Sequence, residues 1–159
     1  MCERGTRVIC DRAFWGGSFI RVINIPEGVK IIGEKAFMWC ESLQTINISE
    51  GVTSIGEEAF YWCTSLESIN LPESVTSIGD YAFGACHRLQ SINIPEGVTS
   101  IGEGALPDNS YKSFFDVYLQ AKNKEVRKKV LDMFSKKERR RIIFKSAIRR
   151  IREKFSRKK

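Results

Sequence analysis

The chain has 159 residues, of which 42% are apolar and 28% charged, a balance that suits a folded domain with a core and excludes a disordered chain. Residues 1–106 contain 7 Lys and Arg against 13 Asp and Glu, for a net charge of −6, whereas residues 107–159 contain 19 against 6, for +13. The chain therefore joins two segments of opposite charge.

Cysteine usage and the N-terminus indicate the compartment. The 5 Cys are an odd number without a CxxC pair, which argues against a disulfide framework or a zinc knuckle and favours a reduced, intracellular setting. The start MCERGTRVICDR lacks the apolar region of a signal peptide, and no run approaches the ~20 apolar residues of a membrane span. We expect a cytoplasmic protein without a transmembrane segment, or a cell-surface protein if the chain is a fragment of a larger exported one.

A repeat of 23 residues organises the chain from residue 9 to about residue 106. The dipeptide Ala-Phe recurs at 13–14, 36–37, 59–60 and 82–83, and Ala105-Leu106 occupies the next position. Further apolar columns keep the same spacing: Ile9, Ile32, Ile55, Ile78 and Ile101; Val29, Val52, Val75 and Val98; Ile20, Leu43, Leu66 and Leu89; Ile23, Ile46, Ile69 and Ile92; Ile25, Ile48, Leu71 and Ile94. A fixed period of this kind predicts a solenoid whose coils bury their apolar faces against one another.

Each repeat divides into a strand, a turn and a corner. In LESINLPES, the alternation of Ile69 and Leu71 with polar residues predicts a strand that ends at Pro72 and stacks in parallel with its copies. The glycine column at 33, 56, 79 and 102 predicts a positive φ or a close approach of the backbone. The segments EEAFYWC and DYAFGAC are interpreted as short helical or 3₁₀ corners that bury Ala, Phe and Cys.

The unit LxxINIPExVxxIGxxAFxxCxx resembles the repeat of the BspA-type leucine-rich repeat family. The segments INLPESVTSIGDYAF and INIPEGVTSIGEGAL carry the resemblance most clearly. It implies a right-handed, β-rich leucine-rich-repeat solenoid with the LxxIxI strands on its concave side. It also implies a protein that binds other proteins, as members of this family do, many of them displayed on cell surfaces.

Three cysteines, Cys40, Cys63 and Cys86, form a column of their own. Stacked coils would bring their Cα atoms close enough that spacing alone does not exclude a disulfide. The repeat supplies no neighbouring Lys or helix terminus that would activate a thiol, and His87 is the single histidine of the chain. We therefore expect a buried structural ladder, with no metal site and no cofactor.

Two surfaces are candidates for binding. The first is an aromatic corner made by Trp15, Trp39, Tyr61 and Trp62, which either shields the phenylalanine column or forms an exposed patch for a partner. The second is the concave face, whose predicted binding residues are Arg21, Asn24, Gln44, Thr45, Asn47, Glu67, Ser68, Asn70, Gln90, Ser91 and Asn93. The asparagine column in this set is either a ladder of side-chain hydrogen bonds or a hydrogen-bonding surface for a ligand.

The repeat breaks at PDNSYKS, and SFFDVYL then predicts a last strand. Phe115 and Val117 replace Ile92 and Ile94 in strict register, whereas Val117 and Leu119 replace them after a slip of two residues; both registers are compatible with the sequence. We accordingly assign residues 1–119 to a repeat domain of about four coils and a terminal half-coil, and residues 120–159 to a basic helical segment.

Two helices are predicted in the basic segment. Asn123 is a candidate N-cap for the first, whose apolar residues Val126, Val130, Met133 and Phe134 follow at helical spacing. Ser135 begins a capping box for a second helix. Its apolar stripe comprises Phe144, Ala147, Ile148, Ile151 and Phe155. The pair is expected to cap the open end of the solenoid.

The second predicted helix is strongly basic, with 13 Lys and Arg against 2 Glu in residues 136–159. It either serves as a soluble cap or binds a partner protein, nucleic acid or an anionic membrane. The candidate polyanion contacts are Arg139, Arg140, Arg141, Lys145, Arg149, Arg150 and Arg152. No paired carboxylates, nucleophile with a base, or phosphate-binding loop is apparent, so we interpret the chain as a non-enzyme. The main hypothesis is a monomeric protein-interaction module, and the alternative is a tether to polyanions.

Overall fold

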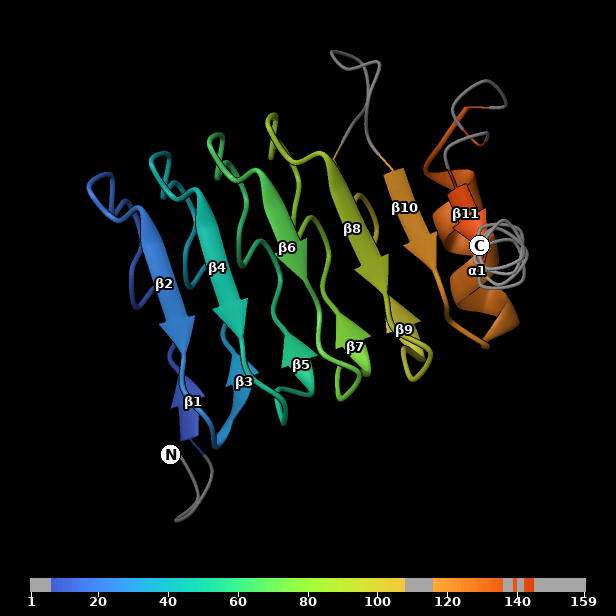
Figure 1. Ribbon diagram of the computed structural model, residues 1–159, viewed down its shortest axis with the longest axis horizontal. Helices are drawn as coiled ribbons and strands as arrows, with labels where there is room; N and C mark the ends of the chain where they lie inside the picture. Colours follow the sequence, from blue (N-terminus) through green and yellow to red (C-terminus); the bar gives the residue numbers. More distant parts are fainter. Residues whose placement is uncertain (1–6, 108–115, 136–138, 140–141, 145–159) are drawn as a thin grey trace, which may run out of the picture.

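The chain winds into a solenoid whose coils contribute strands alternately to two parallel sheets (Figure 1). This arrangement is seen in a computed structural model that describes residues 7–107, 116–135, 139 and 142–144. One sheet has five strands: β1 (Arg7–Ile9), β3 (Val29–Ile32), β5 (Ser54–Ile55), β7 (Ser77–Ile78) and β9 (Ser100–Ile101). The other has six: β2 (Val22–Ile25), β4 (Thr45–Ile48), β6 (Ser68–Asn70), β8 (Ser91–Ile94), β10 (Asp116–Leu119) and β11 (Ile142–Phe144). The single helix of the described residues, α1 (Lys124–Asp132), lies at the end opposite β1 and β2.

The strand register follows the 23-residue period of the sequence. In the six-stranded sheet, Ile46 pairs with Ile23 on one side and with Ile69 on the other. In the five-stranded sheet, Ile55 lies between Ile32 and Ile78 in the same way. The predicted parallel stacking of equivalent residues is therefore confirmed.

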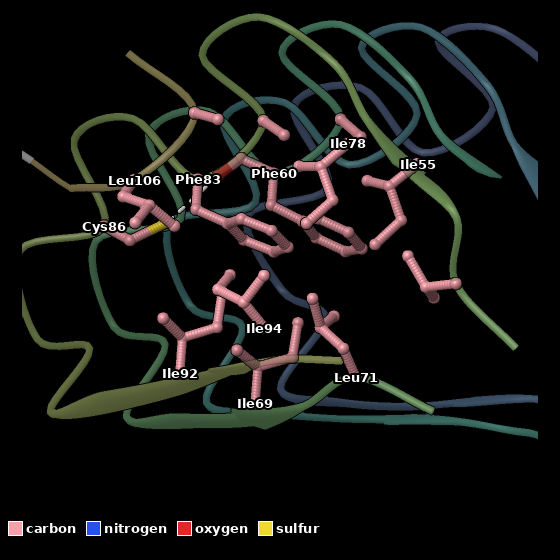
Figure 2. Close-up of a cluster of buried hydrophobic side chains, with 14 of the residues drawn as sticks. Ile55, Phe60, Ile69, Leu71, Ile78, Phe83, Cys86, Ile92, Ile94 and Leu106 are labelled. Atoms are coloured by element: carbon pink, nitrogen blue, oxygen red, sulfur yellow. Dashed lines mark hydrogen bonds between the residues drawn. The ribbon is translucent and has the colours of Figure 1, made fainter. Parts of the chain in front are cut away.

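The core is a stack of identical side chains from successive coils. Phe14, Phe37, Phe60 and Phe83 lie parallel, with ring centroids 5.0, 5.2 and 5.3 Å apart. In Figure 2, aliphatic side chains from β6 and β8, including Ile69 and Ile92, point toward the rings of Phe60 and Phe83. From the second coil onward the predicted columns are almost entirely buried, so the repeat identified the core.

The corners of the coils are successive turns, and the prediction of helical or 3₁₀ corners is wrong. Amides alternate between two kinds of acceptor: Met38 N donates to Lys35 O in its own coil, whereas Phe37 N donates to Ala59 O in the next coil. Bonds to the next coil use amide donors that would bond within the same segment in a helix. Some corner residues also have left-handed backbone conformations, including Lys35 at φ 55° and Trp39 at φ 65°.

The glycine column is explained by crowding of the backbone, the second of its two predicted causes. A Cβ atom at Gly56 would lie 2.7 Å from Glu34 N and 2.8 Å from Gly33 O of the preceding coil. At Gly102 it would lie 2.3 Å from Asp80 N. Neither glycine has a positive φ. Glycine is therefore required here because adjacent coils approach too closely for a side chain.

The last coil takes the slipped register. Val117 pairs with Ile92 and Leu119 with Ile94, so the strict register with Phe115 in the core is wrong. The first predicted helix is confirmed as α1, since the Asn123 side chain accepts hydrogen bonds from Glu125 N and Val126 N at 2.8 and 3.3 Å. Buried side chains of this region, among them Val126, Val130 and Phe134, join the core and cover the end of the solenoid.

The second predicted helix is contradicted where the structure describes it. Ile142–Phe144 is not helical but forms β11, which pairs in parallel with β10 through Ile142 and Val117. The β-branched and aromatic residues of IIF favour a strand, and β10 would otherwise leave an unpaired edge. The rest of the predicted stripe, Ala147, Ile148, Ile151 and Phe155, lies outside the described residues.

Candidate functional site

An open hollow of about 410 Å³ lies over the six-stranded sheet, and we call this surface the sheet face. It is lined by Thr45, Ile46, Asn47, Ile48, Ser68, Ile69, Asn70, Ser91, Asn93 and Tyr118. Six of the predicted concave-face residues are thus brought together around one hollow. Sequence reasoning missed Tyr118, because its place beside Asn93 depends on the slipped register of β10.

The other five predicted residues of this face, Arg21, Asn24, Gln44, Glu67 and Gln90, lie outside the lining of the hollow. Four of them share one position at the start of the coils' strands and stack through backbone hydrogen bonds, such as Gln44 N to Arg21 O at 2.8 Å. Glu67 forms an exposed salt bridge of 3.1 Å with Arg88. Exposed pairs of this kind contribute little to stability. The charges of Glu67 and Arg88 therefore lie beside the hollow, whose lining residues are all uncharged.

The asparagine column adopts three different arrangements. Asn47 Nδ2 donates to Asn24 Oδ1 at 2.7 Å, which is the side-chain ladder that the sequence allowed. Asn93 instead bonds the backbone of the preceding coil, donating to Leu71 O and accepting from Leu71 N, both at 2.7 Å. Asn70 between them is exposed and makes no side-chain hydrogen bond to any described residue. The column therefore contains one side-chain ladder at Asn24 and Asn47, one contact that we call the Asn93 clamp, and one exposed amide at Asn70.

The Asn93 clamp coincides with the shortest strand pairing in the described six-stranded sheet. β6 and β8 pair at Ile69 and Ile92 alone, whereas β2 and β4 pair at four positions. The side-chain amide of Asn93 occupies the donor and acceptor of Leu71 that a neighbouring strand would otherwise use. Beside the hollow, the strand ladder between β6 and β8 is thus interrupted, and an amide side chain satisfies the backbone groups of Leu71.

The chemistry of the hollow is that of uncharged hydrogen-bonding groups. Its polar lining consists of hydroxyl and amide side chains, which donate and accept, and its apolar lining consists of isoleucines. Among the described residues, no group of three or more His, Cys, Asp or Glu is placed to hold a metal ion. The arrangement suits recognition of neutral polar groups, such as peptide amides.

The cysteine column forms the ladder expected from the sequence. Cys40, Cys63 and Cys86 are buried and free, and their Sγ atoms donate to the carbonyl oxygens of Phe14, Phe37 and Phe60 at 3.1, 3.2 and 3.2 Å. The last of these bonds is drawn in Figure 2. Burial raises the pKa of the Cys63 thiol far above its ordinary value and also raises the pKa of Cys40. Burial and the donated hydrogen bonds agree with the structural ladder expected from the sequence, since a buried protonated thiol is a poor nucleophile.

The aromatic corner is exposed along its length. Trp15, Trp39 and Trp62 are 58%, 49% and 39% exposed, and Tyr61 is partly buried beside Trp62, with ring centroids 6.0 Å apart. Trp62 also meets His87 edge to face at 5.6 Å. The rings therefore present apolar surface to solvent as well as covering the corner, which keeps this row a second candidate surface.

A second hollow, of about 570 Å³, lies between the last corners and α1. Its lining combines Tyr81 and Leu106 with Lys129 and Met133 of the helical region. Lys129 Nζ donates to Ile101 O at 3.2 Å, which ties α1 to β9. No sequence signal pointed to this hollow, because it depends on how α1 packs against the repeats.

The predicted polyanion contacts fall mainly outside the described residues. Arg139 is described: its Nε donates to Phe134 O at 3.1 Å and its Nη2 lies 3.4 Å from Asp132 Oδ1. The other six, Arg140, Arg141, Lys145, Arg149, Arg150 and Arg152, lie outside the described residues. Within the part of the chain that is described, no helix has the length and apolar character needed to cross a bilayer.

Comparison with known proteins supports the same fold. A family model described as "BspA type Leucine rich repeat region (6 copies)" matches residues 7–136. Among solved structures, a leucine-rich repeat protein of Treponema pallidum (TpLRR) is 32% identical with a TM-score of 0.68, over 72% of this chain and 52% of that one. A leucine-rich repeat protein of Bacteroides ovatus is 27% identical with a TM-score of 0.59, over 89% of this chain and 42% of that one.

The pneumococcal vaccine antigen PcpA shares the fold, at 21% identity and a TM-score of 0.58, over 72% of this chain and 28% of that one. The curated proteins gave no match. The chain spans about half of the T. pallidum protein and less of the other two. The family match covers most of the chain and agrees with the observed register of its coils. The chain therefore belongs to the BspA-type leucine-rich repeat family.

Proposed function

We propose that this chain is a protein-interaction module that binds its partner on the sheet face and catalyses no reaction. The observation that carries the proposal is the hollow over β4, β6, β8 and β10, lined by uncharged polar side chains on a rigid stack of strands. Leucine-rich repeat proteins generally act through such surfaces. A preformed surface limits the conformational entropy lost on binding.

The partner chemistry follows from the lining. Asn70 offers an amide whose donors and acceptor are unused by other described residues, and Ser68 beside it is exposed. Because the hollow holds no charged side chain, the partner segment in it should be neutral and polar, such as an extended peptide that presents backbone amides. The exposed Glu67 and Arg88 at its margin would affect association rate more than affinity.

Two matched substitutions test this assignment. Asn70 and Ser100 are both exposed polar strand residues, on the six-stranded and five-stranded sheets respectively. The variants Asn70→Arg and Ser100→Arg add the same charge to opposite sheets. Affinity capture of a partner should be lost with Asn70→Arg and retained with Ser100→Arg. Equal capture by both variants, with both shown to be folded by circular dichroism, would exclude the sheet face.

Binding to polyanions is the second candidate, favoured by the net charge of +13 over residues 107–159. Non-specific contacts with phosphates need basic side chains and no base-reading motif. This function would use the end of the chain beyond α1 and would leave the sheet face free for a protein. A cytoplasmic location stays a prediction, and a surface location, which the family resemblance also implies, stays the alternative.

A further inference from the structure

The outer face of α1 presents charged side chains and no exposed apolar one. Its exposed residues are Lys124, Glu125, Arg127, Lys128, Lys129 and Asp132. On the other side of the helix, Val126 and Val130 are buried in the core of the solenoid. The apolar side of α1 is therefore already used by the repeats, and only charged groups remain for a partner.

Three of these residues form a surface that we call the basic patch: Lys124, Arg127 and Lys128. Residues three and four positions apart are neighbours on the surface of a helix. The other cation of α1, Lys129, instead donates to Ile101 O of the repeats. Neither Lys124 nor Lys128 forms an ion pair with a carboxylate of the described residues. The patch therefore presents positive charge that the described part of the chain does not neutralise.

Folding does not account for the lysine at position 124. Lys124 is the first residue of α1, where the helix dipole favours anions and disfavours cations. Lys128 lies four residues further along, and like charges at this spacing destabilise a helix. An anion bound beside the two side chains relieves their repulsion. A role in binding an anion explains an arrangement that stability of the helix does not.

The class of partner follows from what the patch lacks. A membrane-bound helix needs an exposed apolar side, which α1 has lost to the core, and the predicted second helix is contradicted at Phe144, which pairs with Leu119 as part of β11. A protein interface has an apolar centre, which this face also lacks. Phosphate groups need only exposed cations. Residues 1–106 carry a net charge of −6, so a chain of phosphates is attracted to this end and repelled by the coils.

We propose that the basic patch of α1 binds the phosphate backbone of nucleic acid without reading its sequence. The proposal rests on the second candidate function, polyanion binding. It extends the contact from the end of the chain beyond α1 to the helix itself, and it selects nucleic acid over a membrane. In Figure 1, α1 lies at the end of the solenoid beyond β10, opposite the first coil.

Fluorescence anisotropy of a labelled DNA duplex with the 159-residue chain tests the proposal between about 50 and 200 mM salt. Lys124→Gln combined with Lys128→Gln removes two contacts and should weaken binding by about tenfold at ~50 mM salt. It should also reduce the slope of log affinity against log salt by about 1.8, since each phosphate contact contributes about 0.9. Lys124→Arg combined with Lys128→Arg should keep the wild-type affinity and slope.

A stability measurement separates binding from a structural role. The glutamine pair removes the repulsion between Lys124 and Lys128, so urea denaturation should show no loss of stability. The matched control is Arg7→Gln combined with Lys30→Gln, which removes the same charge from exposed residues of β1 and β3. This control should bind the duplex with nearly wild-type affinity.

The outcomes that overturn the proposal differ from those that overturn the proposed functions. If the wild-type chain binds the duplex and the glutamine pair binds equally well, or if both pairs weaken binding equally, the basic patch is excluded and polyanion binding stands. A wild-type chain that does not bind the duplex but binds vesicles containing phosphatidylserine excludes nucleic acid as the partner. Binding to neither probe removes polyanion binding as well. Partner capture on the sheet face is independent of all these results.

Discussion

The phenylalanine stack predicts how stability depends on position within the solenoid. Phe60 is fully buried and stacks on Phe37 at 5.2 Å and on Phe83 at 5.3 Å, whereas Phe14 is 41% exposed and stacks on Phe37 alone at 5.0 Å. Leucine keeps most of the buried apolar area of phenylalanine but removes the ring contacts, and leucine already fills this position in the last coil as Leu106. Phe60→Leu therefore removes two ring contacts and Phe14→Leu removes one.

The magnitude follows from the number of stacked neighbours. Each aromatic pair contributes about 0.5–1.5 kcal/mol beyond area burial, so Phe60→Leu should lower the free energy of unfolding by about 1–3 kcal/mol. Phe14→Leu should cost about half as much. Phe60→Ala, which also leaves a cavity, should cost about 3–5 kcal/mol.

Urea denaturation followed by circular dichroism measures these differences directly, provided that the denaturant slope stays constant across the variants. Nearest-neighbour coupling between coils makes the central position the most sensitive one. The reasoning would be refuted if Phe14→Leu destabilised the protein as much as Phe60→Leu.

Three further predictions concern other parts of the molecule. Cys63 should react slowly with a thiol reagent in the folded protein and rapidly in denaturant, while the exposed Cys10 reacts rapidly in both. Burial raises the pKa of Cys63 above its ordinary 9.0, so the unfolded chain loses this proton at a lower pH than the folded protein. The free energy of unfolding should therefore fall above about pH 9. Rapid native labelling of Cys63 would contradict the buried ladder. Asn93→Ala should cost about 1–3 kcal/mol because it leaves the Leu71 backbone groups unpaired, whereas Asn70→Ala should stay within about 0.5 kcal/mol, as chemical denaturation of the pair would show. If the basic segment binds polyanions, the affinity for double-stranded DNA or anionic vesicles should fall steeply between about 50 and 200 mM salt, and an absence of binding at ~50 mM salt would remove this function.

The sequence predicted the interior of this protein far better than its irregular parts. Because Ile46, Ile69 and Ile92 keep one spacing, their pairing and burial follow once one coil is understood. The corner conformation did not follow, since apolar spacing alone does not distinguish a helical turn from turns that bond to the next coil. The amide of Phe37 donates to Ala59 O of the next coil, and a pattern within one coil does not predict a bond between coils.

The C-terminal end shows the same limit. Helix α1 was predictable because its cap and apolar spacing are local, from Asn123 to Phe134. The strand β11 was not, because the apolar residues of IIF fit a helical stripe until the free edge of β10 is considered. In the candidate site, the place of each residue in the repeat was enough to predict six of the lining residues. The different roles of Asn70 and Asn93 were not predictable, because they depend on the short pairing between β6 and β8.

Site-specific photo-crosslinking tests the central claim, that the sheet face binds the partner, most directly. A photoreactive phenylalanine analogue placed at Asn70 should crosslink to the partner in high yield, and the same group at Ser100 on the opposite sheet should not. Crosslinking at Ser100, with none at Asn70, would contradict the assignment of the sheet face.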